Sequence, residues 1–291
     1  CGCIKGATWF SFDPKSNFDH LYLTCYNISS IRLIDLEEKT VTMQASLSAT
    51  GDKPAIINWT VDENQDMIIS RDLGKDGNVN VLKTRASEFK TEVKLGNSKQ
   101  QAVVGAFVHP QTGNIYYTLY KDQSIYEYKF EDKTTSVIAS HPRVKETLRM
   151  VVHPTGKYAY LLRQYNERGN GYISRMDYNS TTDQFSTPYI VAGSASGSGY
   201  RDGVGSRAQL TQGVFVKNPE YAGEADEYDF YFCDEYNHCI RILTPTGRVV
   251  TFAGRGNDSK DPGFANGALR TEARFAHPWA LAYDEKRKCF S

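Results

Sequence analysis

One short pattern recurs from end to end of this chain: an apolar strand, a turn that opens with a polar residue, and a second strand rich in tyrosine. The residues that open the turn are Asp13, Asp62, His109, His153, Lys217 and Asp284. Successive openers are 49, 47, 44, 64 and 67 residues apart. A period of about 40 to 50 residues built from strands, without long helical patterns, is typical of β-propeller blades and not of helical solenoids. The repeat therefore predicts an all-β fold.

Several repeats continue with a second pair of strands. The segments SIRLIDLEEKTVTMQ, SIYEYKFEDKTTSVIA and CIRILTPTGRVVTFAG alternate between apolar and polar residues around a central turn. Two glycine-rich insertions, GSASGSGYRDGVGSRAQL and GRGNDSKDPGFANGALRTEARF, account for the two longer spacings. We therefore predict a single domain, residues 1–291, that forms a six-bladed β-propeller with four antiparallel strands in each blade. The expected blades span about residues 1–48, 49–96, 97–141, 142–193, 194–254 and 255–291.

The sixth repeat ends at Ser291, midway through its expected second strand. The sixth blade is therefore incomplete in this chain. Because an unfinished blade would leave unpaired backbone groups at a strand edge, we expect the natural chain to continue beyond residue 291.

The fifth repeat and the insertion after it carry a specific order of residues. They are Tyr231, Asp234, Asn237, Ile240, Arg241, Gly247, Thr251, Ala253 and Gly254, followed by Asn266, Gly267, Ala273, Phe275 and Pro278. This order resembles the NHL repeat of β-propeller proteins from about residue 190 to 284, and more weakly before residue 190. The resemblance implies a secreted or surface-attached bacterial protein, a type in which the propeller often follows an immunoglobulin-like TIG domain.

The stretch CDEYNHC, residues 233–239, places two cysteines, a histidine and an aspartate close together. Neighbouring residues of a strand point to opposite faces, so His238 and Cys239 cannot readily share an ion, and no second ligand pair lies nearby. We therefore predict no metal site. Cys233 and Cys239 would face each other across a three-residue bulged loop but not across a two-residue loop. The sequence therefore leaves open whether they form a disulfide. The remaining interpretation is one copy of the structural repeat.

Charge and hydropathy limit the partners to expect. The chain has 34 basic and 34 acidic residues, a balance that disfavours a nucleic-acid partner. It contains no apolar stretch of the roughly 18 residues that span a bilayer, and its start lacks the pattern of a signal peptide. Cys1 leaves a lipid anchor as one alternative. We expect a monomer without a cofactor, with calcium at the acidic residues 224–227 as the one ion to consider, although their spacing is not that of a calcium loop.

A row of mixed residues marks the candidate ligand site. Four positions before each turn opener stand Trp9, Asn58, Gly105, Arg149, Gly213 and Ala280, whereas the neighbouring rows are apolar. Loops that enter the first strands meet at one face of a propeller, and one of them contains His277 and Trp279. We therefore predict a ligand-binding set formed by Trp9, Asn58, Arg149, His277 and Trp279. A guanidinium at a channel mouth needs an acidic ligand or an internal carboxylate as its partner, which makes Arg149 the principal candidate.

The function is predicted from the catalytic motifs that the chain lacks and from the resemblance to NHL-repeat proteins. The chain lacks G-x-S-x-G, P-loop and H-E-x-x-H motifs, and we predict no catalytic residues. We expect a non-catalytic recognition or scaffold module that binds a protein or a glycan at the cell surface through the loop face of the propeller. The alternative is a metal-dependent propeller enzyme, similar to amidating lyases or lactonases, with its site in the central channel.

Overall fold

The computed structural model describes residues 7–12, 20–25, 30–46, 55–61, 67–72, 80–85, 88–94, 103–119, 122–145, 147–163, 171–211, 215–217, 223, 227–255, 262–278, 281, 283–284 and 289–290. The chain divides into two compact units, residues 1–138 with 282–291 and residues 139–281, and each unit is described by itself. Regular structure in the described residues consists of β-strands and two short 3-10 turns, η3 (Gly205–Arg207) and η4 (Glu235–Asn237).

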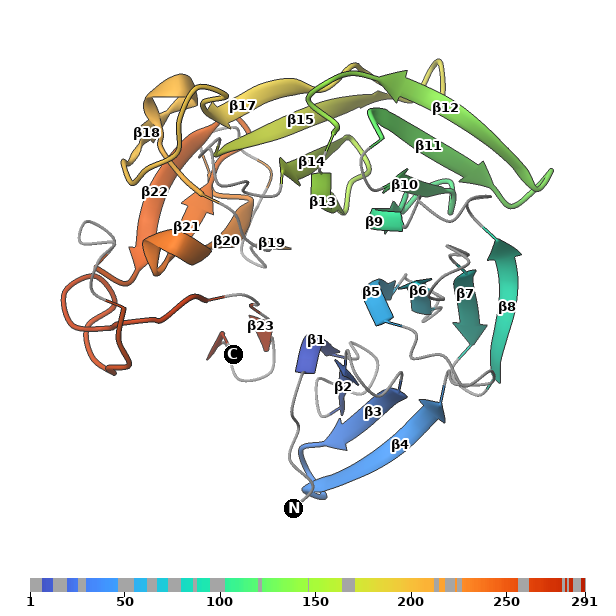
Figure 1. Cartoon of the computed structure of the whole chain (residues 1–291), viewed down its shortest axis with the longest axis horizontal. Helices are drawn as coiled ribbons and strands as arrows, with labels where there is room; N and C mark the ends of the chain where they lie inside the picture. The colour runs from blue at the N-terminus through green and yellow to red at the C-terminus, as the bar shows by residue number, and fades with distance from the viewer. Residues whose placement is uncertain are drawn as a thin grey trace. The chain divides into compact units, whose positions relative to one another are not determined.

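The first unit contains three four-stranded sheets whose strands are neighbours in chain order (Figure 1). Their strands are β1 (Ala7–Phe12), β2 (His20–Cys25), β3 (Ser30–Asp35) and β4 (Thr40–Ser46); β5 (Ala55–Val61), β6 (Met67–Asp72), β7 (Asn80–Arg85) and β8 (Glu88–Lys94); and β9 (Val103–Val108), β10 (Ile115–Leu119), β11 (Ser124–Lys129) and β12 (Thr134–Ser140). A short antiparallel pair, β23 (Tyr283–Asp284) with β24 (Cys289–Phe290), also belongs to this unit.

The second unit contains two five-stranded sheets. The fourth sheet is built from β13 (Thr147–Val152), β14 (Tyr158–Arg163), β15 (Tyr172–Asn179), β16 (Gln184–Phe185) and β17 (Tyr189–Gly193). The fifth sheet is built from β19 (Phe215–Lys217), β20 (Phe230–Asp234), β21 (Cys239–Leu243) and β22 (Arg248–Ala253), with β18 (Gly203–Val204) added at its edge. The predicted all-β propeller with four-stranded antiparallel blades is confirmed, whereas the count of six blades and their boundaries stay predictions.

A β-bulge interrupts the first strand of four sheets at the same place. One residue of the first strand lacks a partner in each case: Thr8 in β1, Ile57 in β5, Val104 in β9 and Leu148 in β13. The last strand is bulged in a matching way in β4, β8, β17 and β22. Equivalent irregularities at equivalent positions show that these sheets are copies of one repeat.

The turn openers act through their side chains. The His109 Nδ1 accepts hydrogen bonds from the backbone N–H groups of Gln111 (3.4 Å) and Thr112 (3.3 Å). The His153 Nδ1 accepts one from the N–H of Thr155 (3.2 Å). An imidazole therefore satisfies the turn backbone here as an Asp side chain does in other turns. These two histidines have a structural role in the first turn of their repeats.

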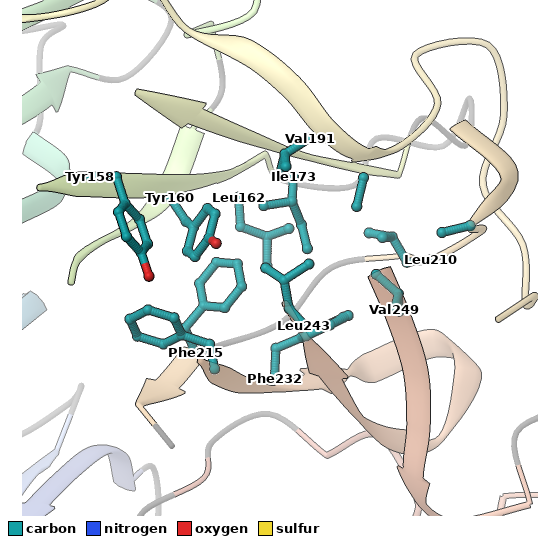
Figure 2. Packing of buried hydrophobic residues seen from close by; sticks show 13 residues of the cluster. Tyr158, Tyr160, Leu162, Ile173, Val191, Leu210, Phe215, Phe232, Leu243 and Val249 are labelled. Atoms are coloured by element: carbon teal, nitrogen blue, oxygen red, sulfur yellow. The ribbon is translucent and has the colours of Figure 1, made fainter. Parts of the chain in front are cut away.

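The core of the second unit lies between the fourth and fifth sheets (Figure 2). Phe230 packs edge-on against Tyr160 with ring centroids 5.5 Å apart, and Phe215 contacts both rings. Edge-to-face pairs of this kind contribute about 0.5 to 1.5 kcal/mol beyond the burial of their area. Ala208 and Leu210, at the end of the first glycine-rich insertion, are fully buried in the same cluster. The insertion is therefore anchored to the core.

Candidate functional site

Three predicted ligand-binding residues lie on first strands beside the bulges. Trp9, Asn58 and Arg149 are each the residue that regains a cross-strand partner immediately after the bulge of β1, β5 and β13. Bulges re-aim side chains and are frequent beside binding sites, so this position suits the predicted role. That these residues meet around one axis stays a prediction. Trp279 lies outside the described residues, as do residues 224–226 of the acidic stretch considered for calcium.

The fourth predicted residue, His277, lies against the turn between β20 and β21. Its ring centroid is 4.5 Å from that of His238 and 5.6 Å from that of Tyr236, edge-on to both. Its backbone N–H donates to the His238 Nδ1 at 3.1 Å, and its own Nδ1 is 3.8 Å from the Glu235 Oε1. The His277 side chain is 54% exposed, so a ligand can reach it. We name these four residues the His277 cluster.

Two residues of the His277 cluster have left-handed backbone, as do Lys39, Lys133 and Asp183 among the other described residues. His238, which follows η4, has a φ of 53°, and His277 has a φ of 49°. Left-handed backbone at residues other than glycine is uncommon and concentrates at binding and active sites. Because the strands alternate in direction, the β20–β21 turn and the segment that enters β19 lie at the same end of the fifth sheet. In the fifth sheet, the end predicted to bind ligand therefore carries imidazole, phenol and carboxylate groups.

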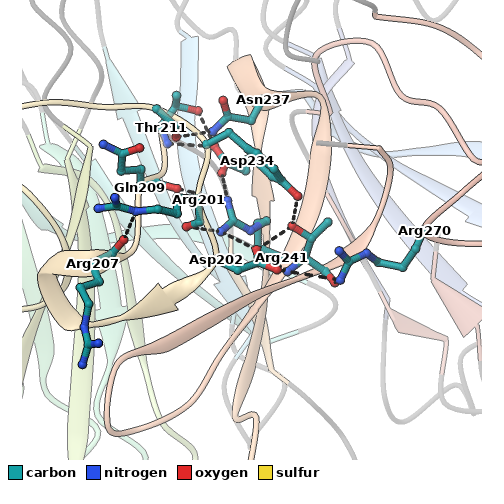
Figure 3. Close-up of polar contacts among 12 residues, drawn as sticks. Arg201, Asp202, Arg207, Gln209, Thr211, Asp234, Asn237, Arg241 and Arg270 are labelled. Carbon is teal, nitrogen blue, oxygen red and sulfur yellow. Dashed lines mark hydrogen bonds and ion pairs between the residues drawn. The ribbon is translucent and has the colours of Figure 1, made fainter. Parts of the chain in front are cut away.

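A buried ion pair connects this end of the sheet to the first insertion (Figure 3). Arg241 and Asp234 have no exposed side-chain surface, and the Arg241 Nη1 donates to the Asp234 Oδ2 at 2.7 Å. The Asp234 Oδ1 accepts the backbone N–H of Thr211 at 2.8 Å. The Arg241 Nη2 donates to the carbonyl of Arg201 (3.0 Å) and to the Asp202 Oδ1 (3.1 Å). The pair therefore holds the insertion onto β20 and β21.

Further contacts fix the insertion from both sides. The Asp202 Oδ1 accepts hydrogen bonds from the backbone N–H (3.0 Å) and hydroxyl (2.9 Å) of Thr251. The Arg270 Nη1 lies 3.9 Å from the Asp202 Oδ2. The Asn237 amide donates to the carbonyl of Gly199 at 2.8 Å. The polar residues of the repeat thus position the glycine-rich insertion as well as their own turn.

Cys233 and Cys239 are both buried, and the structure does not join them by the disulfide that the sequence left open. Across β20 and β21, Cys233 pairs with Ile240 and Cys239 pairs with Asp234. The loop holds four residues, 235–238, which places the two thiols one register position apart on opposite faces of the sheet. Burial also raises the pKa of the Cys239 thiol well above its usual value, which disfavours the reactive thiolate.

A second buried carboxylate, Asp229, precedes β20. Its Oδ2 accepts hydrogen bonds from the hydroxyls of Tyr158 and Tyr160, both at 2.9 Å, while its Oδ1 has no hydrogen-bond partner among the described residues. Burial raises the pKa of Asp229 to about 6, against the opposing effect of the two tyrosine hydrogen bonds and of Arg175. The sequence alone did not single out this residue, because an aspartate before a strand has the same appearance as a turn aspartate.

Two features are not found among the described residues, a metal centre and a membrane-spanning helix. Among them, the structure contains no group of three or more His, Cys, Asp or Glu side chains placed to hold a metal ion. In the same part of the chain, every helix is too short or too polar to cross a lipid bilayer. Among the described residues, His277 and Tyr236 present exposed side chains at the loop end of the fifth sheet.

Known proteins resemble this chain in structure and sequence. Neither a protein-family model nor a curated protein matches the sequence. An auxiliary nutrient binding protein from Bacteroides ovatus is 39% identical, with a TM-score of 0.80 over 100% of this chain and 67% of that protein. An auxiliary nutrient binding protein from Bacteroides thetaiotaomicron is 38% identical, with a TM-score of 0.78 over 98% of this chain and 65% of that protein. The chain belongs to the family of these Bacteroides proteins.

This Bacteroides family includes a third similar structure. A Bacteroides thetaiotaomicron protein named "Putative phosphatase" is 30% identical, with a TM-score of 0.78 over 100% of this chain and 69% of that protein. The chain thus spans about two thirds of the length of the family members it matches. The NHL repeat stays a resemblance carried by residues 190–284, since no family model matches.

Proposed function

We propose that this chain is a non-catalytic binding module that acts outside the cytoplasm. Its ligand is a nutrient, either a glycan or a protein. The observation that carries this proposal is the 39% identity over the whole chain to a Bacteroides protein named for auxiliary nutrient binding. In this proposal the module is an NHL-type propeller that belongs to a secreted or surface-attached protein. A lipid anchor is one way in which such a protein is attached to the surface.

The proposed ligand surface is the end of the sheets where loops enter the first strands. Two observations support this location. Arg149, like its counterparts Trp9 and Asn58, follows a bulge in its strand. The His277 cluster supplies an exposed imidazole beside a partly exposed Tyr236. Aromatic rings and a few polar groups on rigid elements are typical of surfaces that recognise sugars and peptides.

A binding screen followed by substitution tests the proposal. The full-length protein is screened on glycan and peptide arrays, and the affinity of the best ligand is then measured by calorimetry. We expect Arg149→Ala and Trp279→Ala each to weaken binding at least tenfold, because truncating a central charged or aromatic contact costs about 1 to 2 kcal/mol or more. Lys157→Ala is the control, since Lys157 lies in the β13–β14 turn at the opposite end of its sheet. Unchanged affinity in both test variants would place the ligand elsewhere.

An enzyme is the second candidate, and the family member named "Putative phosphatase" is the observation that favours it. Hydrolysis of p-nitrophenyl phosphate and of a simple lactone by the purified full-length protein tests this candidate, together with elemental analysis of bound metal. The binding-module proposal predicts no turnover above a heat-denatured control. Turnover that disappears on metal removal and returns on metal addition would replace the binding module with a metal-dependent enzyme.

A further inference from the structure

The first insertion forms a pocket of about 330 Å³. It is lined by Arg201, Asp202, Gly203, Val204 and Arg207. These residues form a small hairpin, because Arg201 and Gln209 exchange two backbone hydrogen bonds of 3.2 and 2.9 Å. We name the segment from Arg201 to Gln209 the 201–209 hairpin.

The 201–209 hairpin is held in one conformation. The Gly205 N–H donates to the carbonyl of Gly247 at 3.0 Å, and Ala208 is fully buried in the core. Arg241 binds the carbonyl of Arg201 and the carboxylate of Asp202 from within the protein. A pocket that is already ordered avoids part of the entropy cost of ligand binding.

The pocket has an excess of positive charge. Arg201 and Arg207 are exposed. The Nε of Arg201 donates to the carbonyl of Arg207 at 2.6 Å, whereas its terminal nitrogens make no hydrogen bond or ion pair with the described residues. The guanidinium of Arg207 likewise has no partner among the described residues, and it points away from the network (Figure 3). The one carboxylate of the pocket, Asp202, is already paired with buried Arg241.

We propose that this pocket binds the carboxylate group of a small anionic ligand, specifically a uronic acid unit of an acidic glycan. A guanidinium offers a planar pair of N–H donors that matches the two oxygens of a carboxylate. The pocket volume lies at the lower end of the roughly 300 to 1,000 Å³ of small-ligand sites, which suits one sugar unit. The choice of a sugar rests on the proposed nutrient-binding function, whereas recognition of the carboxylate rests on the two arginines alone.

Glucuronate and glucose form the matched pair of probes, since they share a ring and differ in the carboxylate. Calorimetry and saturation-transfer NMR on the full-length protein at low salt should show binding of glucuronate and not of glucose. The affinity should fall as NaCl is raised, because the contacts are charged and exposed. Binding of both sugars with equal affinity, or of neither, would overturn the proposal.

Substitutions locate the site. Arg207→Gln and Arg201→Gln should each lower the affinity for glucuronate about tenfold, the loss expected for one charge-assisted hydrogen bond. Lys157→Gln removes the same charge in the β13–β14 turn and should leave the affinity unchanged. If Arg201→Gln fails to fold, Arg207→Gln decides, because the Arg207 guanidinium makes no hydrogen bond or ion pair with the described residues. Full affinity in Arg207→Gln would overturn the assignment.

Binding of sulfate and binding of array glycans distinguish the uronic acid proposal from the alternatives. Inorganic sulfate that binds as tightly as glucuronate, and is weakened equally by Arg207→Gln, would show a general oxyanion site and overturn the uronic acid assignment. A neutral glycan that binds the full-length protein while glucuronate does not would overturn the pocket proposal and leave the nutrient-binding function in place. Glucuronate binding lost in Arg207→Gln, with every array ligand negative, would support the pocket and contradict the wider function.

Discussion

Arg241 is among the largest side chains that are fully buried in the described part of the chain, and it forms ion pairs with Asp234 and Asp202. A buried charge is tolerated only when it is paired and hydrogen-bonded, so these partners are required by the fold. The repeat pattern identified Arg241 and Asp234 as repeat positions. It could not identify Asp202, which lies 39 residues before Arg241 in an insertion that the earlier repeats lack.

Asp229 should give the protein a measurable pH dependence. The pKa of Asp229 is about 6 in the folded protein and 3.8 in its ordinary state, so the folded state binds more protons between these values. The contribution of this group to stability is therefore highest below about pH 4 and falls as the pH rises through 6, by about 3 kcal/mol in all. In Asp229→Asn, the amide oxygen can still accept the tyrosine hydrogen bonds, but the charge is absent.

Urea unfolding at pH 4, 5, 6 and 7 measures this effect. We expect the difference in unfolding free energy between Asp229→Asn and the unsubstituted protein to move in favour of the variant by up to about 3 kcal/mol from pH 4 to pH 7. Glu131→Gln, at an exposed turn, is the control and should show a constant difference. A constant difference for Asp229→Asn as well would contradict the raised pKa.

At the scale of elements, strands and turns were predictable and two additional strands were not. The second unit carries β16 and β18 beyond the four strands expected in a blade. In β18, Gly203 and Val204 pair with the outer edge of β22 and so cover backbone groups that would otherwise stay unpaired. Two residues are too short for alternation to reveal a strand, and their glycine-rich setting indicates a loop.

Gly247, in the turn between β21 and β22, should be intolerant of any side chain. Its φ is 84°, and a Cβ atom would lie 2.0 Å from the backbone oxygen of Val191 in the neighbouring sheet. Gly113 has a similar φ of 70° but open space around it. Gly113→Ala should cost only the left-handed conformation, about 1 to 2 kcal/mol, whereas Gly247→Ala should cost at least about 2 kcal/mol more. Urea unfolding compares the two variants, and equal losses would contradict the close approach of the two sheets at Gly247.

At the scale of the whole molecule, the fold was predictable because one pattern of strands recurs many times along the chain. The row that contains Trp9, Asn58 and Arg149 was predictable for the same reason. Aligning the repeats shows that this position holds mixed residue types, whereas the neighbouring positions are apolar. The pocket at Arg201 and Arg207 has no equivalent in the first four repeats, so aligning them cannot reveal it. A net charge of zero also conceals a local excess of arginine.

The segment after β22 should act as a cover for one face of the fifth sheet. On that face, Cys233, Ile240 and Ala253 are buried, and Phe275 and Leu281 from the later segment pack against them. A chain that ends at residue 254 should therefore expose Cys233, while Cys239 stays protected on the opposite face beneath the first insertion. Alkylation with iodoacetamide at pH 7.5, followed by peptide mass spectrometry, measures both thiols. In the full chain the exposed Cys289 should react and both buried thiols should not. Continued protection of Cys233 in the shortened chain would show that another segment covers this face, and labelling of both thiols would show that the fifth sheet does not fold without its cover.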